Sequence, residues 1–322
     1  MRNVFRAAIV CACVGLLAAT AAAENYPTKP VRIVIPFPPG AGPDIVARTI
    51  GPVLSKRWGQ QIVVDNRPGG GGNIATELAA RAPADGYTLL LASDHFTVNP
   101  SLFSKVAYDP VRDFVPITDA AFTPNILVVH PSLPVHSVKG LIALAKSRPM
   151  QINFASGGNG SVGHLAGEMF DLAAGVRMVH VPYKGPVAAM TSLLNGETQV
   201  GFLLVAAVLP QVEAGKLRAL AITGSKRSPA APQLPTLAEA GVPNCEIVAW
   251  QGLFAPAGTP PDVVKKIYRD TKAALDLPEI KHALLMRGLE TVGSSPQDFS
   301  AYIKADIVKW AKIVKEAHIH VD

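Results

Sequence analysis

Three segments of the sequence combine glycine, proline and small hydroxyl residues just before a helix-like segment. They are Pro38-Pro39-Gly40-Ala41-Gly42, Gly69-Gly70-Gly71-Gly72 and Ser156-Gly157-Gly158-Asn159-Gly160-Ser161. The first amides of a helix lack intrahelical partners and together carry about half a positive charge. Without side chains in the way, these amides can approach a carboxylate or phosphate closely. Glycines also serve tight turns for purely geometric reasons, but three such turns in one chain favour anion binding.

Two of these turns match the glycine pattern of dinucleotide-binding proteins. "GNGSVG" at 158–163 fits G-x-G-x-x-G, and "GGGNIA" at 70–75 fits the variant that ends in alanine. That signature also needs an acidic residue about 20 positions later, at the end of the next strand. The strand-like segment after 158–163 ends in Tyr183 and Lys184, whereas Glu77 and Asp85 come too early after 70–75. We therefore predict no nucleotide cofactor, and no other cofactor is indicated.

Ser161 and His164 are the residues that could support nucleophilic catalysis. "NGSVG" resembles a nucleophile elbow, but Asn159 occupies the position of its first glycine. An exported serine hydrolase using Ser161 and His164 stays open as an alternative function. His164 and Glu168 are four residues apart and could share a metal, but the sequence shows no third ligand and no H-E-x-x-H motif. We interpret His164 as polar support near a helix start and predict neither a catalytic nor a metal site.

The elements that must position these turns alternate between strand and helix. Strands are predicted at 31–37, 61–66, 87–93, 125–131, 177–183, 199–205 and 217–223, and helices at 43–59, 73–82, 137–148, 185–196 and 296–317. Segment 152–175 has the order strand, glycine turn, helix, whereas the residues between 93 and 125 have few regular signals. This alternation predicts an α/β fold with a mainly parallel sheet flanked by helices. In the helix at 43–59, Asp44 is interpreted as a capping residue.

The N-terminus has the layout of a secretory signal peptide. Arg2 and Arg6 precede an apolar run at 7–19, and Ala21-Ala22-Ala23 supplies the small residues before a cleavage site. The apolar run is shorter than the about 20 residues of a membrane-spanning helix. We therefore predict cleavage after Ala23, which leaves Cys245 as the remaining cysteine and allows no intrachain disulfide. Cys245 is interpreted as a small buried apolar residue.

Composition and length limit the possible partners and domains. A chain of about 300 residues after cleavage suggests two lobes of about 150 residues each. With 49% hydrophobic residues, the chain can bury two cores. The formal charge of +6 is not gathered in a basic run with interleaved aromatic residues. Nucleic-acid binding is therefore not indicated, whereas a small anionic ligand is compatible with the charge.

Together, these segments resemble the Bug/TctC family of periplasmic solute receptors. The resemblance is carried by "YPTKPVRIVIPFPPGAGPDIVAR", "VVDNRPGGGGNIATELAARAPADGYTLLLAS", "FASGGNGSVGHLAGE", "VPYKG", "AGKLRALAIT" and "LPTLAEAGVP…WQGLFAPAGTP". It spans nearly the whole chain after the predicted leader. It implies a non-enzymatic periplasmic receptor of the Venus flytrap type, with the leader at 1–23, lobe 1 at 24–123 and 226–322, and lobe 2 at 124–225.

The resemblance also implies where a ligand binds. Family members hold a small organic acid between the lobes, largely through backbone amides, and serve a tripartite tricarboxylate permease of the inner membrane or act alone. We expect a monomer. By position, the implied ligand-binding residues are Pro38, Pro39, Gly40, Ala41, Gly42, Ser93, Asp94, Thr97, Ser156, Gly157, Gly160, Ser161, His164, Tyr183, Lys184, Gly185 and Leu203.

Two positions depart from the pattern of this family. Many relatives have aspartate immediately after the phenylalanine of the strand that matches "QVGF", and a second aspartate three residues before it. The corresponding residues here are Leu203 and Gln199. The loss of a carboxylate that faces the ligand predicts a ligand without an amino group, and one that is more apolar or aromatic.

Overall fold

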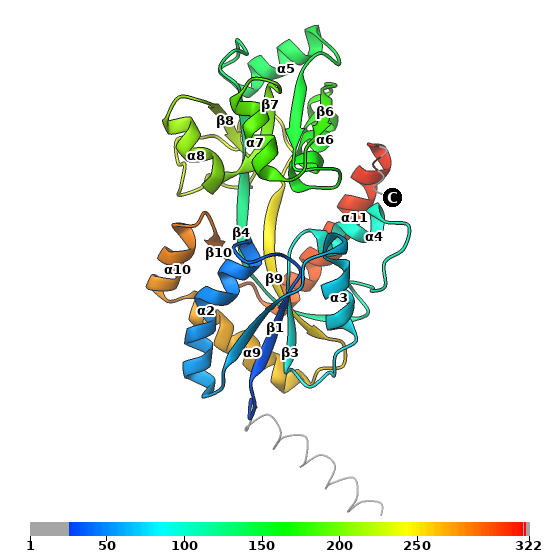
Figure 1. Cartoon of the computed structure of the whole chain (residues 1–322), viewed down its shortest axis with the longest axis vertical. Coiled ribbons are helices and arrows are strands. Elements are labelled where there is room, and N and C mark those ends of the chain that lie inside the picture. Colours follow the sequence, from blue (N-terminus) through cyan, green and yellow to red (C-terminus); the bar gives the residue numbers. More distant parts are fainter. Residues whose placement is uncertain (1–25, 318, 320–322) are drawn as a thin grey trace, which may run out of the picture.

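The computed structural model describes residues 26–317 and 319. Its elements form two lobes stacked along the long axis of the molecule, and strands β4 and β9 run from one lobe into the other (Figure 1). The predicted signal peptide lies outside the described residues. Within them, no helix combines the length and the apolar character that crossing a membrane requires.

Lobe 1 is built on the strands nearest the N-terminus and on the last third of the chain. Its strands are β1 (Val31–Ile35), β2 (Ile62–Asn66), β3 (Thr88–Ala92), the first half of β4 (Phe114–Val129), β9 (Val248–Pro256) and β10 (Glu290–Thr291). Its helices are α2 (Gly42–Trp58), the short 3-10 helix η1 (Gly70–Gly72), α3 (Asn73–Ala80), α4 (His95–Leu102), α9 (Pro261–Leu275), α10 (Pro278–Leu285) and α11 (Pro296–Glu316).

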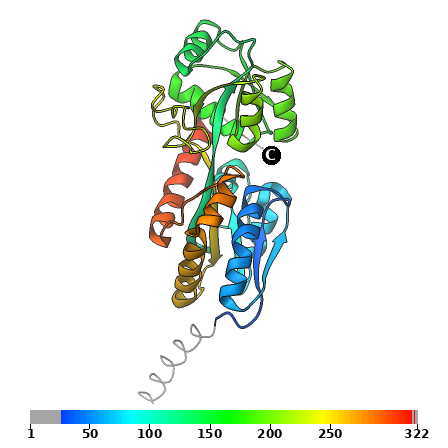
Figure 2. The same ribbon diagram turned by 90° about the vertical axis from the view of Figure 1, so that its left-hand side faces the viewer.

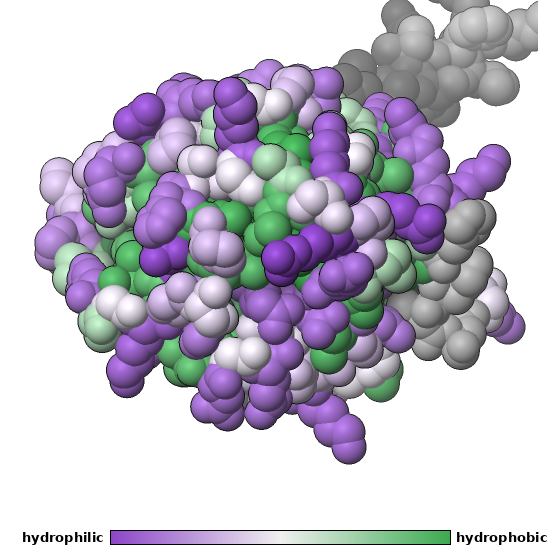
Figure 3. All heavy atoms as spheres, turned by 90° about the horizontal axis from the view of Figure 1, so that it is seen from above, coloured by the Kyte–Doolittle hydropathy of each residue, from purple (hydrophilic) through white to green (hydrophobic). Residues whose placement is uncertain are grey.

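Lobe 2 is built on the middle of the chain. Its strands are the second half of β4, β5 (Asn153–Ser156), β6 (Val179–Pro182), β7 (Val200–Leu204) and β8 (Arg218–Ile222). Its helices are α5 (Val138–Ser147), α6 (Val162–Ala174), α7 (Pro186–Leu194) and α8 (Val205–Glu213). Seen from above, this end of the molecule is mostly hydrophilic, with smaller hydrophobic areas between the polar side chains (Figure 3).

The strand order confirms the predicted α/β class. It also shows that the central strands β4 and β9 pair antiparallel, which the alternation of strands and helices in the sequence does not show. The order is β2-β1-β3-β9-β4-β7-β5-β6, with β8 and β10 also paired to β4. The outer pairs of each lobe are parallel, as predicted. The pairs made by β4 and β9 are antiparallel, because these two strands run in opposite directions between the lobes.

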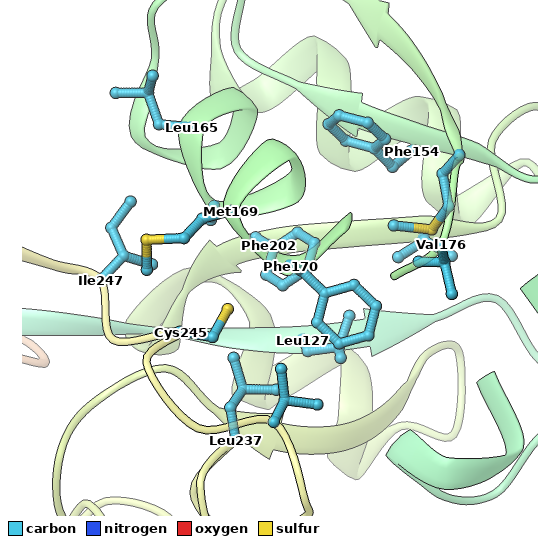
Figure 4. Close-up of a cluster of buried hydrophobic side chains, with 14 of the residues drawn as sticks. Leu127, Phe154, Leu165, Met169, Phe170, Val176, Phe202, Leu237, Cys245 and Ile247 are labelled. Atoms are coloured by element: carbon cyan, nitrogen blue, oxygen red, sulfur yellow. The ribbon is translucent and has the colours of Figure 1, made fainter. Parts of the chain in front are cut away.

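The chain returns to lobe 1 later than the sequence suggested. The sequence suggested a boundary near Ser225, but residues 224–247 stay attached to the end of β8, where the Leu237 N–H donates to the Ile222 carbonyl and the Ile247 N–H donates to the Thr223 carbonyl. Leu237, Cys245 and Ile247 join a buried cluster made mainly of lobe 2 residues, together with some residues of α4 and α11. Figure 4 shows these side chains beside Met169 and Leu127, and Figure 2 shows the segment lying along lobe 2. The apolar residues of this proline-rich segment therefore pack with those of β4, α6 and β7, and β9 is the strand that leads from this segment into the lower half of the molecule (Figure 1).

Cys245 lies inside this cluster, as the sequence predicted. Only 3% of the residue is exposed, and burial raises the pKa of its thiol to about 12. A thiol with that pKa is protonated at neutral pH and is therefore a poor nucleophile. Cys245 is a packing residue.

Asp171 makes the stability of lobe 2 depend on pH. Its residue is 9% exposed, one carboxylate oxygen accepts the Met178 N–H at 2.6 Å, and burial is the main cause that raises its pKa to about 6. The folded chain therefore binds a proton more tightly than the unfolded chain, whose aspartate pKa is about 3.9. Its contribution to stability is fully present below about pH 4 and is lost as the pH rises to about 6.

We therefore expect Asp171→Asn to stabilise the fold at pH 7 by up to about 3 kcal/mol relative to the wild type, with little difference at pH 4. Urea denaturation at both pH values measures this. Equal differences at pH 4 and pH 7 would contradict the assignment of the pH dependence to Asp171.

Candidate functional site

The sheet registers bring the carboxyl ends of both sets of parallel strands to one place. β9 runs from lobe 2 into lobe 1, and β3 pairs antiparallel to it, so β3, β1 and β2 all end toward lobe 2. β4 runs the other way and β7 pairs antiparallel to it, so β7, β5 and β6 all end toward lobe 1. Ligands of open α/β sheets bind at such carboxyl ends. We call this region the interlobe junction.

The two sets of strand ends are separated by a short stretch of β4. In lobe 1, Ala92 at the end of β3 pairs with Gly252 of β9. The next residue of β9 toward lobe 2 is Gln251, which pairs with Ala121 of β4. In lobe 2, Leu204 at the end of β7 pairs with Asn125 of β4. Ala121 and Asn125 are four residues apart, or about 13 Å at about 3.3 Å per residue.

Helices α2, α3 and α4 of lobe 1 and α6, α7 and α8 of lobe 2 all begin at the interlobe junction, because each follows one of these strand ends (Figure 1). The first turns of the fully described helices α3, α6, α7 and α8 contain no acidic residue. Away from these strand ends, α9, α10 and α11 each have an acid in the first turn, whereas α5 has none and is capped by Ser137. An acid there would offset the positive helix terminus. Of the six helix starts at the junction, α2 has Asp44 in its first turn and α4 is preceded by Asp94, whereas the starts of α3, α6, α7 and α8 keep their positive charge without an acidic side chain in the first turn.

The first predicted turn, Pro38 to Gly42, leads into α2 and is largely exposed. Gly40 has a φ of 88°, in the left-handed region that favours glycine. Asp44 of α2 accepts the Gly40 N–H at 2.9 Å and an Arg48 guanidinium N–H at 2.9 Å, and these contacts lower its pKa although burial opposes the shift. Asp44 was predicted to cap α2. It fixes the turn before the helix instead, and within the described chain no side chain caps α2.

The residues after β3 divide into junction residues and core residues. Ser93 is buried and donates a hydrogen bond from Oγ to Asp94 at 2.7 Å. Burial is the main cause that raises the Asp94 pKa to about 6. Thr97 is fully buried and donates to Asp306 of α11 at 2.7 Å. Ser93 and Asp94 therefore lie at the strand end, whereas Thr97 joins α4 to α11.

The second-lobe turn, from Ser156 to Ser161, is held together from behind. Ser156 is fully buried, and its Oγ lies 2.6 Å from His180 Nε2. The His180 ring stacks on the His164 ring, with centroids 3.7 Å apart and an interplanar angle of 8°. Burial, with a smaller effect of His164, lowers the His180 pKa to about 4, so His180 is neutral at neutral pH. The exposed part of the turn is Gly157 to Ser161, and Ser156 and the two histidines support it.

The geometry around Ser161 gives the hydrolase alternative no support. Ser161 Oγ accepts the His164 backbone N–H at 3.4 Å and so caps α6. His164 Nδ1 accepts the Gly160 N–H at 3.0 Å, and its Nε2 lies 3.6 Å from Glu168. Within residues 26–317 and 319, neither ring nitrogen of His164 bonds the Ser161 hydroxyl, which is the contact that an activated serine needs. His164 supports the turn, as the sequence suggested.

The last predicted residues lie around the starts of α7 and α8. Lys184 is exposed, and Tyr183 and Gly185 are half-buried; Gly185 has a φ of 98° and precedes Pro186 of α7. Leu203 is only 6% exposed and packs in a lobe 2 cluster, whereas its neighbour Leu204 is 40% exposed and precedes α8. Side chains alternate along a strand, so Leu204 is turned away from that cluster.

Gln199 lies at the amino-terminal end of the lobe 2 strands, far from the interlobe junction. It precedes β7, and its side-chain oxygen accepts the Asn153 N–H at 3.0 Å. Gln199, which stands where many relatives have aspartate, therefore contacts the first residues of β5 and β7 and does not reach the interlobe junction.

Sequence reasoning missed two polar residues of the junction, His95 and Gln251. His95 follows Ser93 and Asp94 directly, and Gln251 lies in the "WQGLF" strand. Both side chains are at least nine-tenths buried. The one available signal was the place of His95 immediately after a predicted strand end.

Comparisons with known proteins agree with this geometry. Residues 46–319 match the model of the tripartite tricarboxylate transporter family receptor. Protein BugT of Bordetella pertussis is 37% identical over 302 residues, which cover 93% of each chain. An R. palustris protein solved with adipate is 39% identical with a TM-score of 0.79, covering 92% of this chain and all of the other. MatC from Rhodopseudomonas palustris with bound malate is 30% identical with a TM-score of 0.74, covering 90% of this chain and all of the other.

The match to the family model covers most of the chain, and the relatives are similar over nearly their whole length. The family resemblance seen in the glycine turns is thereby confirmed, and so is the solute-binding fold. This chain belongs to the tripartite tricarboxylate transporter family of receptors.

Proposed function

We propose that the chain is an exported, non-enzymatic receptor that binds one small carboxylate at the interlobe junction. The observation that carries this proposal is the convergence of helix N-termini from both lobes with no acid in the first turns of α3, α6, α7 and α8. A bound carboxylate would supply the missing negative charge and accept hydrogen bonds from the free amides. The adipate and malate in two related structures support a carboxylate ligand.

The proposed ligand contacts are the exposed and half-buried residues of the junction. In lobe 1 these are the Pro38–Gly42 turn and the half-buried Asp94, with the buried Ser93 held beside it by their hydrogen bond, and in lobe 2 the Gly157–Ser161 turn with Tyr183, Lys184 and Gly185. The buried residues Thr97, Ser156, His164 and Leu203 are proposed to act behind these contacts by positioning the turns. Leu204 is exposed at the same edge and favours an apolar part in the ligand.

The proposed domain boundaries follow from the two crossings. Lobe 1 comprises residues 24–123 and the chain from β9 to the C-terminus, and lobe 2 comprises the segment between them. We propose that the mature chain acts in the periplasm as a monomer and delivers its ligand to an inner-membrane permease of the tripartite tricarboxylate type, or to a sensor. No cofactor enters this function.

Isothermal titration calorimetry with adipate and with malate tests the proposal. We expect saturable binding of at least one of these acids at one molecule per chain, weakened by salt because the attraction is electrostatic. Dimethyl adipate is the matched control, because it has the same carbon chain without the charges and is expected not to bind. Equal binding of adipate and its dimethyl ester, or a complex whose ligand lies away from the junction, would contradict the proposal.

A further inference from the structure

His95 is a buried side chain whose hydrogen-bonding groups are unused by the protein. It is the first residue of α4 and is 8% exposed. Neither of its ring nitrogens has a hydrogen-bond partner within the part of the chain that the structure describes. Burial lowers its pKa to about 3, so the ring is neutral at neutral pH and carries one N–H donor and one acceptor. Buried polar groups are almost always paired, so an unpaired one calls for a partner from outside the protein.

The His95 ring is directed at the start of α3. A Cβ atom placed on Gly72, the residue that precedes α3, would lie 2.4 Å from His95 Cδ2 and 2.7 Å from Nε2. The ring also meets Phe37 edge-on, with centroids 4.9 Å apart. Phe37 immediately precedes the Pro38–Gly42 turn into α2. His95 therefore lies between the turns that lead into α2 and α3.

A second unpaired polar group lies at the start of α2. Gln251 is 2% exposed, and its Nε2 donates to the Ala249 carbonyl at 2.9 Å, which leaves its Oε1 without a partner among the described residues. A Cβ atom on Gly42 would lie 2.8 Å from Gln251 Nε2. The starts of α2 and α3, neither of which has a side-chain cap, thus each have an unpaired polar side chain packed against them. In lobe 2 the side chains behind the Ser156–Ser161 turn are paired with one another.

We infer that His95 is a specificity-determining residue of a lobe 1 subsite, where its ring N–H donates to a second carboxylate of the ligand at the start of α3. This inference rests on the proposed function and narrows the ligand to a dicarboxylate with one acid group in each lobe. The first carboxylate meets the helix starts of α6 and α7, and the second meets His95 and the amides of α2 and α3. The Gln251 oxygen then accepts from an ordered water or a ligand hydroxyl.

Adipate and hexanoate are matched probes for this inference, because they share a six-carbon chain and differ in the second carboxylate. We expect the wild-type chain to bind adipate at least tenfold more tightly than hexanoate. His95→Phe retains the aromatic packing and removes the N–H, so it should lose at least tenfold in adipate affinity and at most threefold in hexanoate affinity. His95→Gln, which keeps a donor and an acceptor, should restore part of the adipate affinity. His130→Phe is the matched control, since His130 pairs with Ser132 outside the junction and its variant should bind both acids normally.

Ring-nitrogen NMR of the wild-type chain gives a readout that does not depend on any variant folding. The His95 nitrogen signals, assigned in the wild-type chain by through-bond correlation to the His95 backbone, should shift with adipate and not with hexanoate. Equal wild-type affinities for the two acids, an equal loss of both in His95→Phe, or unchanged His95 signals with adipate would overturn the inference and leave the proposed function standing. Binding of no carboxylate at all would overturn both.

Discussion

Val187→Asp should bind carboxylates at least tenfold more weakly than the wild type while its fold becomes slightly more stable. Val187 is the second residue of α7 and is 80% exposed at the interlobe junction. An acid in a first helical turn stabilises a helix by about 0.3–1 kcal/mol. The same charge would repel a bound carboxylate by roughly 3 kcal/mol at about 6 Å and an effective dielectric constant of about 20. Calorimetry and urea denaturation measure the two opposite effects.

Two controls separate charge from position. Val187→Asn adds a polar group of similar size without a charge and should bind within about threefold of the wild type. Lys139→Asp places an acid in the same second position of α5, which begins at the far end of lobe 2 because β4 runs away from the junction (Figure 1). It should leave affinity nearly unchanged. If Val187→Asp binds as tightly as Lys139→Asp, the helix starts at the junction do not hold the ligand.

Asp306→Ala should destabilise the fold by about 3–5 kcal/mol. Asp306 lies in α11, is 3% exposed and accepts hydrogen bonds from Thr97 Oγ1 at 2.7 Å and from the indole nitrogens of Trp310 and Trp250 at 3.0 and 3.3 Å. Lys309 Nζ lies 2.7 Å from its other oxygen. The alanine variant leaves these buried donors unpaired, and each such group carries a desolvation cost of about 1–3 kcal/mol. Urea denaturation followed by tryptophan fluorescence measures the loss.

Asp276→Ala is the matched control for Asp306→Ala. Asp276 also pairs with lysines, Lys272 and Lys281, but its side chain is 49% exposed. Exposed ion pairs contribute about 0–1 kcal/mol, so this variant should remain close to the wild type. A similar cost for both alanine variants would show that Asp306 does not organise the contact of α11 with α4 and β9.

The glycine turns and the strands before them could be predicted because their signals are local. Apolar β-branched runs such as Val31–Ile35 end at residues that allow unusual backbone angles, and a periodic apolar pattern follows. The Pro38–Gly42 turn is also part of the segments on which the family resemblance was recognised. These features locate the helix starts without any knowledge of the tertiary structure.

Helix α4 and the first half of β4 could not be predicted in the same way. Six of the eight residues of α4 are buried, so the helix has no polar face to produce a periodic pattern, and it contains Pro100. The first half of β4 contains Pro116 and Asp119, which are unusual in a central strand. In the structure, the register with β9 shifts beside both residues, which accommodates them.

His95 and Gln251 were missed for a different reason. Each is a single residue outside any motif. Each is of interest because the folded chain gives at least one of its polar atoms no hydrogen-bond partner among the described residues. Whether a buried histidine has a partner depends on residues distant in sequence, here Gly72 and Phe37. Sequence spacing has no means to show an unpaired group.

The burial of Cys245 has a practical consequence for watching the receptor at work. A thiol with a pKa of about 12 inside a packed cluster is protected from maleimide reagents, which need an accessible thiolate. With the predicted leader removed, a cysteine introduced on the surface would be the reactive position of the molecule. Fluorophores can therefore be attached to one introduced cysteine in each lobe, and the separation of the lobes can be followed without replacing Cys245.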